Sequence, residues 1–160
     1  ENKETSYSRS VIKGGGVLRD FCHEIDLASW IFGVQDLQYA YGSHIGTYMI
    51  DGEDYVKLLL TGNQKFLVEI TLNSLQKIPS RNIQIVTHTK NIGIDLLSGI
   101  VSINNNIESI ENSIDQTYFD MHNDILNLNS ASIATVQDGL LVDKIIGLAE
   151  QCMQQNRGKL

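Results

Sequence analysis

The chain has 160 residues, 42% of them apolar, and carries a formal net charge of −7 at pH 7. Its length and apolar content predict a single domain that can bury a core of its own. The 12 basic residues are scattered, which argues against binding to nucleic acid or an anionic membrane surface, because neutralising phosphates requires clustered Lys and Arg.

No apolar run approaches the roughly 20 residues that a membrane-spanning helix needs. The first ten residues are polar, lack a signal-peptide core and do not begin with Met, so we expect a piece of a longer protein. The two cysteines, Cys22 and Cys152, lie far apart in the sequence and form no disulfide framework. This pattern favours a cytoplasmic location.

Residues 1–13 show no regular pattern, and residues 16–32 show a helical one. Strand patterns follow the helix. Gly33 is placed to end the helix. The predicted strands are 37–50, 55–62, 65–75, 81–89, 92–97 and 100–104. Their short connections favour antiparallel pairing, because parallel strands need long crossovers.

Within the strand 65–75, Phe66, Val68, Ile70 and Leu72 alternate with more polar residues, which predicts one buried face and one mixed face. Residues 103–113 are rich in Asn, Ser and Glu and are expected to form a loop.

Helical patterns return over 115–128 and 135–153. In the second of these, the predicted apolar stripe consists of Val136, Leu140, Ile145, Leu148, Ala149 and Cys152. The sequence therefore predicts an α+β fold, with an open, mainly antiparallel sheet of about six strands and helices packed on one face.

The stretch "GGGVLRDFCHEIDLASW", residues 14–30, joins three glycines to a helix with several titratable side chains. A dinucleotide-binding loop needs glycine at its first, third and sixth positions after a strand, but the sixth position here is Arg19. No Gly-Lys-Ser/Thr follows, as a P-loop requires. We therefore interpret the glycines as allowing a tight turn and a close backbone approach.

Helical periodicity divides residues 17–32 into two sides. The apolar side, expected to face the sheet, contains Val17, Leu18, Phe21, Cys22, Ile25, Ala28 and Phe32. The opposite side contains Arg19, Asp20, His23, Asp26, Leu27 and Trp30.

His23 has a carboxylate three residues before it, Asp20, and another three residues after it, Asp26. Both are within side-chain reach on a helix, where a carboxylate can orient one ring nitrogen and leave the other for proton transfer. A solvated helix face is the alternative interpretation. Trp30 favours a face that is covered by something outside this chain, because a Trp is costly to leave in water. No spacing of His and Cys suits a zinc site.

"GGGVLRDFCHEIDLASWIFG" closely resembles the segment that opens the C-terminal domain of the Gfo/Idh/MocA oxidoreductases, the glucose–fructose oxidoreductase and inositol dehydrogenase family. "SRNIQIVTHTKNIGIDLLSG" and "ATVQDGLLVDKIIGLAEQ" are similar to later parts of that domain. The resemblance implies that residues 1–160 form one substrate-binding and oligomerisation domain. An N-terminal Rossmann domain, which binds NAD or NADP, would be absent from this chain.

The resemblance also implies roles for individual residues. His23 matches the family's catalytic histidine, and Arg19 occupies the slot where many members carry a substrate-binding Asp. Asp20 is one place later, so it either holds substrate or orients His23. Asp26 and Tyr7 are further candidates for substrate contact.

The implied function is an NAD(P)-dependent oxidoreductase that acts on a CH–OH group of a sugar or sugar nucleotide, with this chain inactive by itself. The implied partners are the substrate, the chain's own Rossmann domain and further copies of the chain, paired through the sheet face. A non-catalytic oligomerisation or ligand-binding module of the same fold remains the alternative.

Overall fold

A computed structural model describes residues 7–46, 51–63, 66–110, 114–129 and 133–157. The chain forms two compact units, one made of residues 1–75 and 134–160 and the other of residues 76–133. Over the described ranges, no helix is long and apolar enough to cross a bilayer.

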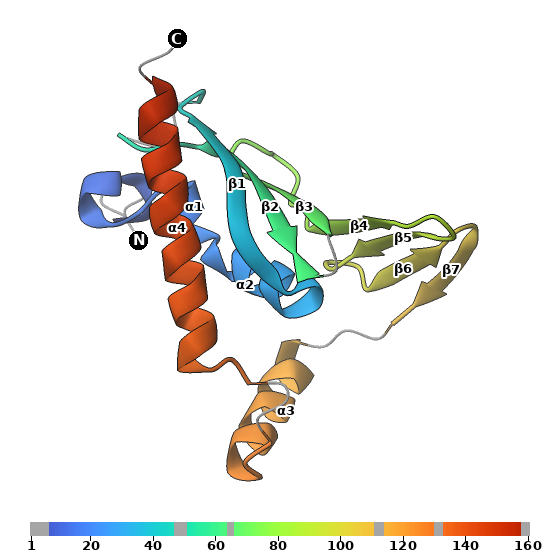
Figure 1. The fold of residues 1–160 in the computed structure, drawn as a ribbon. Helices are drawn as coiled ribbons and strands as arrows, with labels where there is room; N and C mark the ends of the chain where they lie inside the picture. The colour runs from blue at the N-terminus through green and yellow to red at the C-terminus, as the bar shows by residue number, and fades with distance from the viewer. Residues whose placement is uncertain (1–6, 47–50, 64–65, 111–113, 130–132, 158–160) are drawn as a thin grey trace. The chain divides into compact units, whose positions relative to one another are not determined.

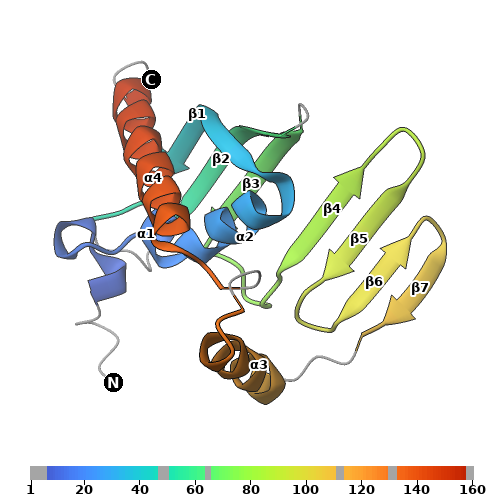
Figure 2. The same ribbon diagram turned by 60° about the horizontal axis from the view of Figure 1, so that its bottom comes forward.

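The first unit combines a three-stranded antiparallel sheet, in the order β1-β2-β3, with helices on one of its faces (Figures 1 and 2). Its elements are the 3-10 turns η2 (Tyr7–Arg9) and η3 (Val11–Lys13), α1 (Val17–Asp20), α2 (Cys22–Phe32), β1 (Val34–Ser43), β2 (Tyr55–Gly62), β3 (Leu67–Asn73) and α4 (Val136–Arg157). Two parts of the predicted strands, residues 47–50 and Lys65, lie outside the described residues.

The core of this unit lies between the sheet and the helices. Strand alternation buries Val68, Ile70 and Leu72 of β3, as predicted from their spacing, and these residues pair with Leu60, Leu58 and Val56 of β2. Phe66, which was predicted to share this buried face, lies before β3 and is 38% exposed. The opposite face remains mixed, as the 68% exposed Leu67 shows. The prediction that helices cover one sheet face is confirmed.

The predicted helix at 16–32 is interrupted once. Its apolar side is buried as predicted: Val17, Leu18, Ile25 and Ala28 lie in the core, and Phe21, Cys22 and Phe32 pack against it. Phe21 leaves helical geometry, with φ −104° and ψ 27°, and separates α1 from α2.

Gly33 ends α2 in the left-handed conformation, with φ 58°, and its N–H donates to the carbonyl of Ser29. A glycine adopts this conformation without the steric cost that other residues incur. The predicted end of the helix is therefore confirmed.

The long helix α4 packs along β1 with a different stripe from the predicted one. Its buried residues are Val142, Ile145, Ile146, Ala149 and Met153. Val136 and Leu140, which we expected to be buried, are 74% and 62% exposed. Both stripes contain Ile145 and Ala149, so the helix is rotated about its axis relative to the prediction. Packing against β1 and α2 determines that rotation.

The second unit contains a four-stranded antiparallel meander and one helix (Figure 2). Its elements are β4 (Asn82–Val86), β5 (Asn91–Asp95), β6 (Ile100–Ile103), β7 (Asn106–Ser109) and α3 (Ile114–Leu126). The α+β class and the antiparallel pairing are confirmed. The strands form two hydrogen-bonded ladders instead of one continuous sheet, and β7 lies in the stretch expected to be a loop.

Candidate functional site

The glycine loop before α1 uses its backbone donors internally. The N–H groups of Gly14, Gly15 and Gly16 donate to the carbonyls of Val11, Ser10 and Ser8, at N···O distances of 2.9, 2.8 and 3.0 Å. A phosphate cradle requires such donors to point at the ligand. The loop therefore has the structural role expected from the sequence, a turn that brings two backbone segments together.

Gly15 makes this close approach possible. A Cβ at this position would collide with the backbone of Tyr7 and Ser8. The contact holds the segment that carries Tyr7 against the start of α1, and Ser8 reaches far enough to donate a side-chain hydrogen bond to Asp20. The predicted site residues Tyr7 and Asp20 thus belong to neighbouring segments.

Asp20 is half-buried at the C-terminal end of α1. Desolvation raises the pKa of its carboxyl group above the usual value of 3.8, and the hydrogen bond from Ser8 acts in the opposite direction. A carboxylate in this setting can accept a hydrogen bond from a substrate hydroxyl or from a nearby imidazole.

His23 is exposed on the first turn of α2, and 54% of its side chain is accessible to solvent. Its Nε2 lies 3.3 Å from Oε1 of Glu24, and its ring meets the edge of Phe21 at a centroid distance of 6.0 Å. The sequence pattern did not indicate Glu24, because adjacent helical residues are not expected to face each other. An accessible imidazole beside a carboxylate can accept or donate a proton.

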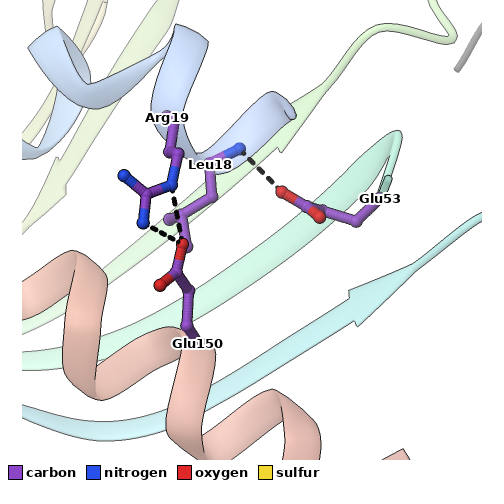
Figure 3. A network of polar contacts seen from close by, with 4 residues as sticks. All are labelled: Leu18, Arg19, Glu53 and Glu150. Carbon is purple, nitrogen blue, oxygen red and sulfur yellow. Dashed lines mark hydrogen bonds and ion pairs between the residues drawn. The ribbon is translucent and has the colours of Figure 1, made fainter. Parts of the chain in front are cut away.

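Arg19 points toward α4. Its Nε and Nη2 lie 2.8 and 2.7 Å from Oε1 of Glu150, so one carboxylate oxygen binds two guanidinium nitrogens (Figure 3). Both side chains are partly exposed, and an ion pair at such a surface contributes little stability. The structure therefore brings Arg19 together with Glu150 of α4.

The loop that precedes β2 supplies three acidic residues, none of which the sequence patterns identified as important. Oε1 of Glu53 accepts the N–H of Leu18 at 3.2 Å (Figure 3). Asp51 accepts the N–H of Val11 at 2.7 Å, and Asp54 accepts the N–H of Gly46 at 2.6 Å. Together they tie the loop to the glycine segment and to the end of β1.

The remaining candidates lie near the same helix. Asp26 is half-buried on α2, one turn after His23, while Trp30 is 73% exposed one turn further along. Tyr7 is 63% exposed. Within the described part of the chain, no group of three or more His, Cys, Asp or Glu side chains could hold a metal ion.

Structural comparison finds the fold of this chain in known enzymes. The chain superposes on UDP-N-acetylglucosamine 3-dehydrogenase GnnA from Acidithiobacillus ferrooxidans with a TM-score of 0.61 and 20% identity, over 86% of this chain and 46% of that one. It superposes on the WlbA dehydrogenase from Bordetella pertussis, solved with NADH and UDP-GlcNAcA, with a TM-score of 0.67 and 16% identity.

This chain has their fold over about half of their length. The WlbA match covers 89% of this chain and 46% of that one, and a Thermotoga maritima protein matches with a TM-score of 0.70 and 16% identity, over 93% and 48%. At the level of the fold, the resemblance to Gfo/Idh/MocA oxidoreductases is confirmed. By sequence, no family model and no curated protein matches this chain.

Proposed function

We propose that this chain is the C-terminal domain of an NAD(P)-dependent oxidoreductase that acts on a sugar or sugar nucleotide. The observation that carries the proposal is the fold shared with about half of two sugar-nucleotide dehydrogenases. The exposed His23, with Asp20 one turn before it, provides the chemistry such a domain needs. An upstream Rossmann domain would complete the enzyme.

The glycine loop does not fit a nucleotide pyrophosphate, because its three N–H groups donate within the loop. We therefore assign NAD or NADP mainly to the upstream domain, where the bound nicotinamide would accept or return the hydride of the substrate carbon. Trp30 and Ile31, which are 73% and 38% exposed on α2, suit the surface that such a domain would cover.

His23 would act as the acid/base for the substrate hydroxyl. In oxidation, the imidazole of His23 would take the proton of the substrate O–H, and the nicotinamide would take the hydride from the carbon that bears this hydroxyl. Reduction would reverse both transfers. Asp20 has two open roles: it holds a substrate hydroxyl or it orients His23. Its hydrogen bond from Ser8 fixes the carboxylate in either case.

Arg19, Asp26 and Tyr7 are proposed to contact substrate. Arg19 would exchange Glu150 for a substrate phosphate or hydroxyl, which is feasible because an exposed ion pair is weak. We also place the enzyme in the cytoplasm, a reducing compartment that suits Cys22 and Cys152, neither of which is in a disulfide.

The outer face of the β1–β3 sheet is proposed to pair with a second copy of the chain. Tyr39 and Leu67 are 46% and 68% exposed there, and Leu59, which pairs with Tyr39 of β1 and Glu69 of β3, is half-buried. A salt bridge between Lys57 and Glu69, at 3.1 Å, crosses the same face. Light scattering on the intact enzyme should show a dimer or larger assembly that Leu67→Glu weakens, whereas a monomer at tens of micromolar would contradict the proposal.

The deciding experiment is an assay of the intact enzyme with NAD and UDP-N-acetylglucosamine or its uronic acid, followed by absorbance of NADH. His23→Ala should lower kcat about 100-fold or more, because a positioned acid/base typically contributes that much. His88→Ala is the matched control, since His88 is exposed in the second unit. Normal turnover in the His23 variant would overturn the assignment.

Two further measurements separate the alternatives. Asp20→Asn should reduce kcat less than His23→Ala if Asp20 only orients the imidazole, and comparably if it holds substrate. Residues 1–160 alone should not bind NADH in a fluorescence titration. If the intact protein also neither binds nor turns over nicotinamide cofactors, the non-catalytic module becomes the better interpretation.

A further inference from the structure

The helix that carries Asp20 has no N-terminal cap of its own. Its N-cap position is Gly16, which has no side chain and adopts φ 107° and ψ 152°. The first N–H groups of a helix have no partner within the helix and require an acceptor from elsewhere. Ser, Thr, Asp or Asn usually provides one from the N-cap position, and glycine cannot.

Glu53 supplies two of the missing acceptors from a different part of the chain. Its backbone carbonyl accepts the N–H of Val17 at 3.3 Å, and its Oε1 accepts the N–H of Leu18 at 3.2 Å (Figure 3). The residue is only 6% exposed. A buried carboxylate at the start of a helix also interacts favourably with the positive end of the helix dipole.

Gly16 is required for this arrangement. A Cβ at position 16 would lie 2.8 Å from Oε1 of Glu53, so a capping side chain on the helix itself would displace the carboxylate. Gly16 therefore leaves the space in which Glu53, from the loop before β2, caps the N-terminus of α1.

The cap stabilises α1, which is a short helix. α1 has four residues, and the N–H of Asp20 donates to the carbonyl of Gly16 at 2.9 Å. The two residues that Glu53 holds, Val17 and Leu18, therefore lie in the same single turn as Asp20. His23 follows only three residues later, after the break at Phe21.

We propose that Glu53 is a positioning residue that sets the place of Asp20 and His23 for proton transfer; this inference rests on the proposed function. Glu53 does not touch the reacting atoms. It acts through the backbone of α1, whose Val17 and Leu18 are each 1% exposed and lie in the core. Misplacement of a reacting group by about 1 Å can reduce the rate about 100-fold.

The test compares three variants of the intact enzyme. Glu53→Ala removes the side-chain acceptor and should lower kcat about 10- to 100-fold, with KM changed less than threefold. Glu53→Gln keeps an oxygen that can accept the Leu18 N–H and should retain kcat within about threefold of the wild type. Asp54→Asn is the matched control, because Asp54 is a buried carboxylate of the same loop that binds Ile45 and Gly46 instead of α1.

Hydrogen exchange provides a readout independent of activity. In mass spectrometry of the same proteins, the peptide covering residues 17–24 should exchange faster in Glu53→Ala but not in Asp54→Asn. If the peptide 17–24 exchanges faster in Glu53→Ala while the wild-type enzyme shows no turnover with any nicotinamide cofactor, the proposed function is wrong, but Glu53 still caps α1. If Glu53→Ala leaves kcat within twofold, or Asp54→Asn lowers it equally, the positioning role is overturned.

Discussion

Substituting Gly16 with Ala tests the contact on which the start of α1 depends. The backbone at this position, φ 107° and ψ 152°, is one that L-residues rarely adopt, which costs about 1–3 kcal/mol. The new Cβ would also lie 2.8 Å from Oε1 of Glu53 and push it away from the Leu18 N–H. Losing a cap costs about 1 kcal/mol, so the expected loss of unfolding free energy is about 2–4 kcal/mol.

The measurement is urea denaturation followed by far-UV circular dichroism, because the single tryptophan, Trp30, is too exposed to report on the core. Gly14→Ala is the matched control: its φ is also positive, 87°, but no atom lies within 4 Å of the added Cβ. It should cost only the strain of a left-handed residue, about 1–2 kcal/mol.

A double-mutant cycle isolates the contact with Glu53. In the Glu53→Ala background the acceptor that Gly16→Ala displaces is already missing, so Gly16→Ala should cost about 1 kcal/mol less than in the wild type. Strict additivity of the two substitutions would refute the reasoning, because it would show that the glycine is needed for its backbone conformation alone.

Three further predictions concern other parts of the first unit. Ile25→Ala should lower the free energy of unfolding by about 2–5 kcal/mol, because Ile25 is fully buried. Trp30→Ala should change it by less than about 0.5 kcal/mol, because Trp30 is exposed. Equal losses for the two variants in urea denaturation would mean that α2 turns its other side to the core. Asp20→Asn should stabilise the protein increasingly as pH rises above 4, because desolvation raises the pKa of Asp20 in the folded state and so disfavours its charged form; thermal melts between pH 3 and 7 that differ by a constant amount would contradict this. Thr135→Ala should destabilise α4 by about 1 kcal/mol, since Thr135 and Asp138 cap each other's backbone N–H groups. The hydrogen bonds from Thr135 lower the pKa of Asp138, so the capping contribution is present at neutral pH and is lost as pH falls through that lowered pKa. Thermal melts of the wild type and of Thr135→Ala in acid should therefore show a shrinking difference in stability.

The candidate site was only partly predictable from the sequence. Helical spacing placed Asp20 and His23 on the side opposite Ile25, and the structure agrees, because a helix of fixed period must turn one side to the core. The partners of these residues were not predictable. Ser8 reaches Asp20 because Gly15, which has no Cβ, lets the backbone of Ser8 lie close to it. The composition around Glu53 predicts a turn but does not indicate that Glu53 binds the start of α1.

The sequence by itself determined the order of the elements and which side of most of them is apolar. Local spacing carries that information: alternation buries Val68 and Ile70 of β3, and Gly33 ends α2 because it tolerates a positive φ. Such features depend on residues a few positions apart.

Tertiary structure alone decided the rotation of α4, the division of the strands into two ladders, and the contacts that hold α1. Glu53 binds Leu18 across 35 residues and Arg19 binds Glu150 across 131, separations over which no periodic pattern extends. Two apolar stripes on α4 were compatible with the sequence, and packing against β1 and α2 selects between them. Contacts of this kind form only when distant segments are brought together. The hydrophobic burial that brings them together is not directional, so the sequence pattern does not indicate which polar side chains will meet.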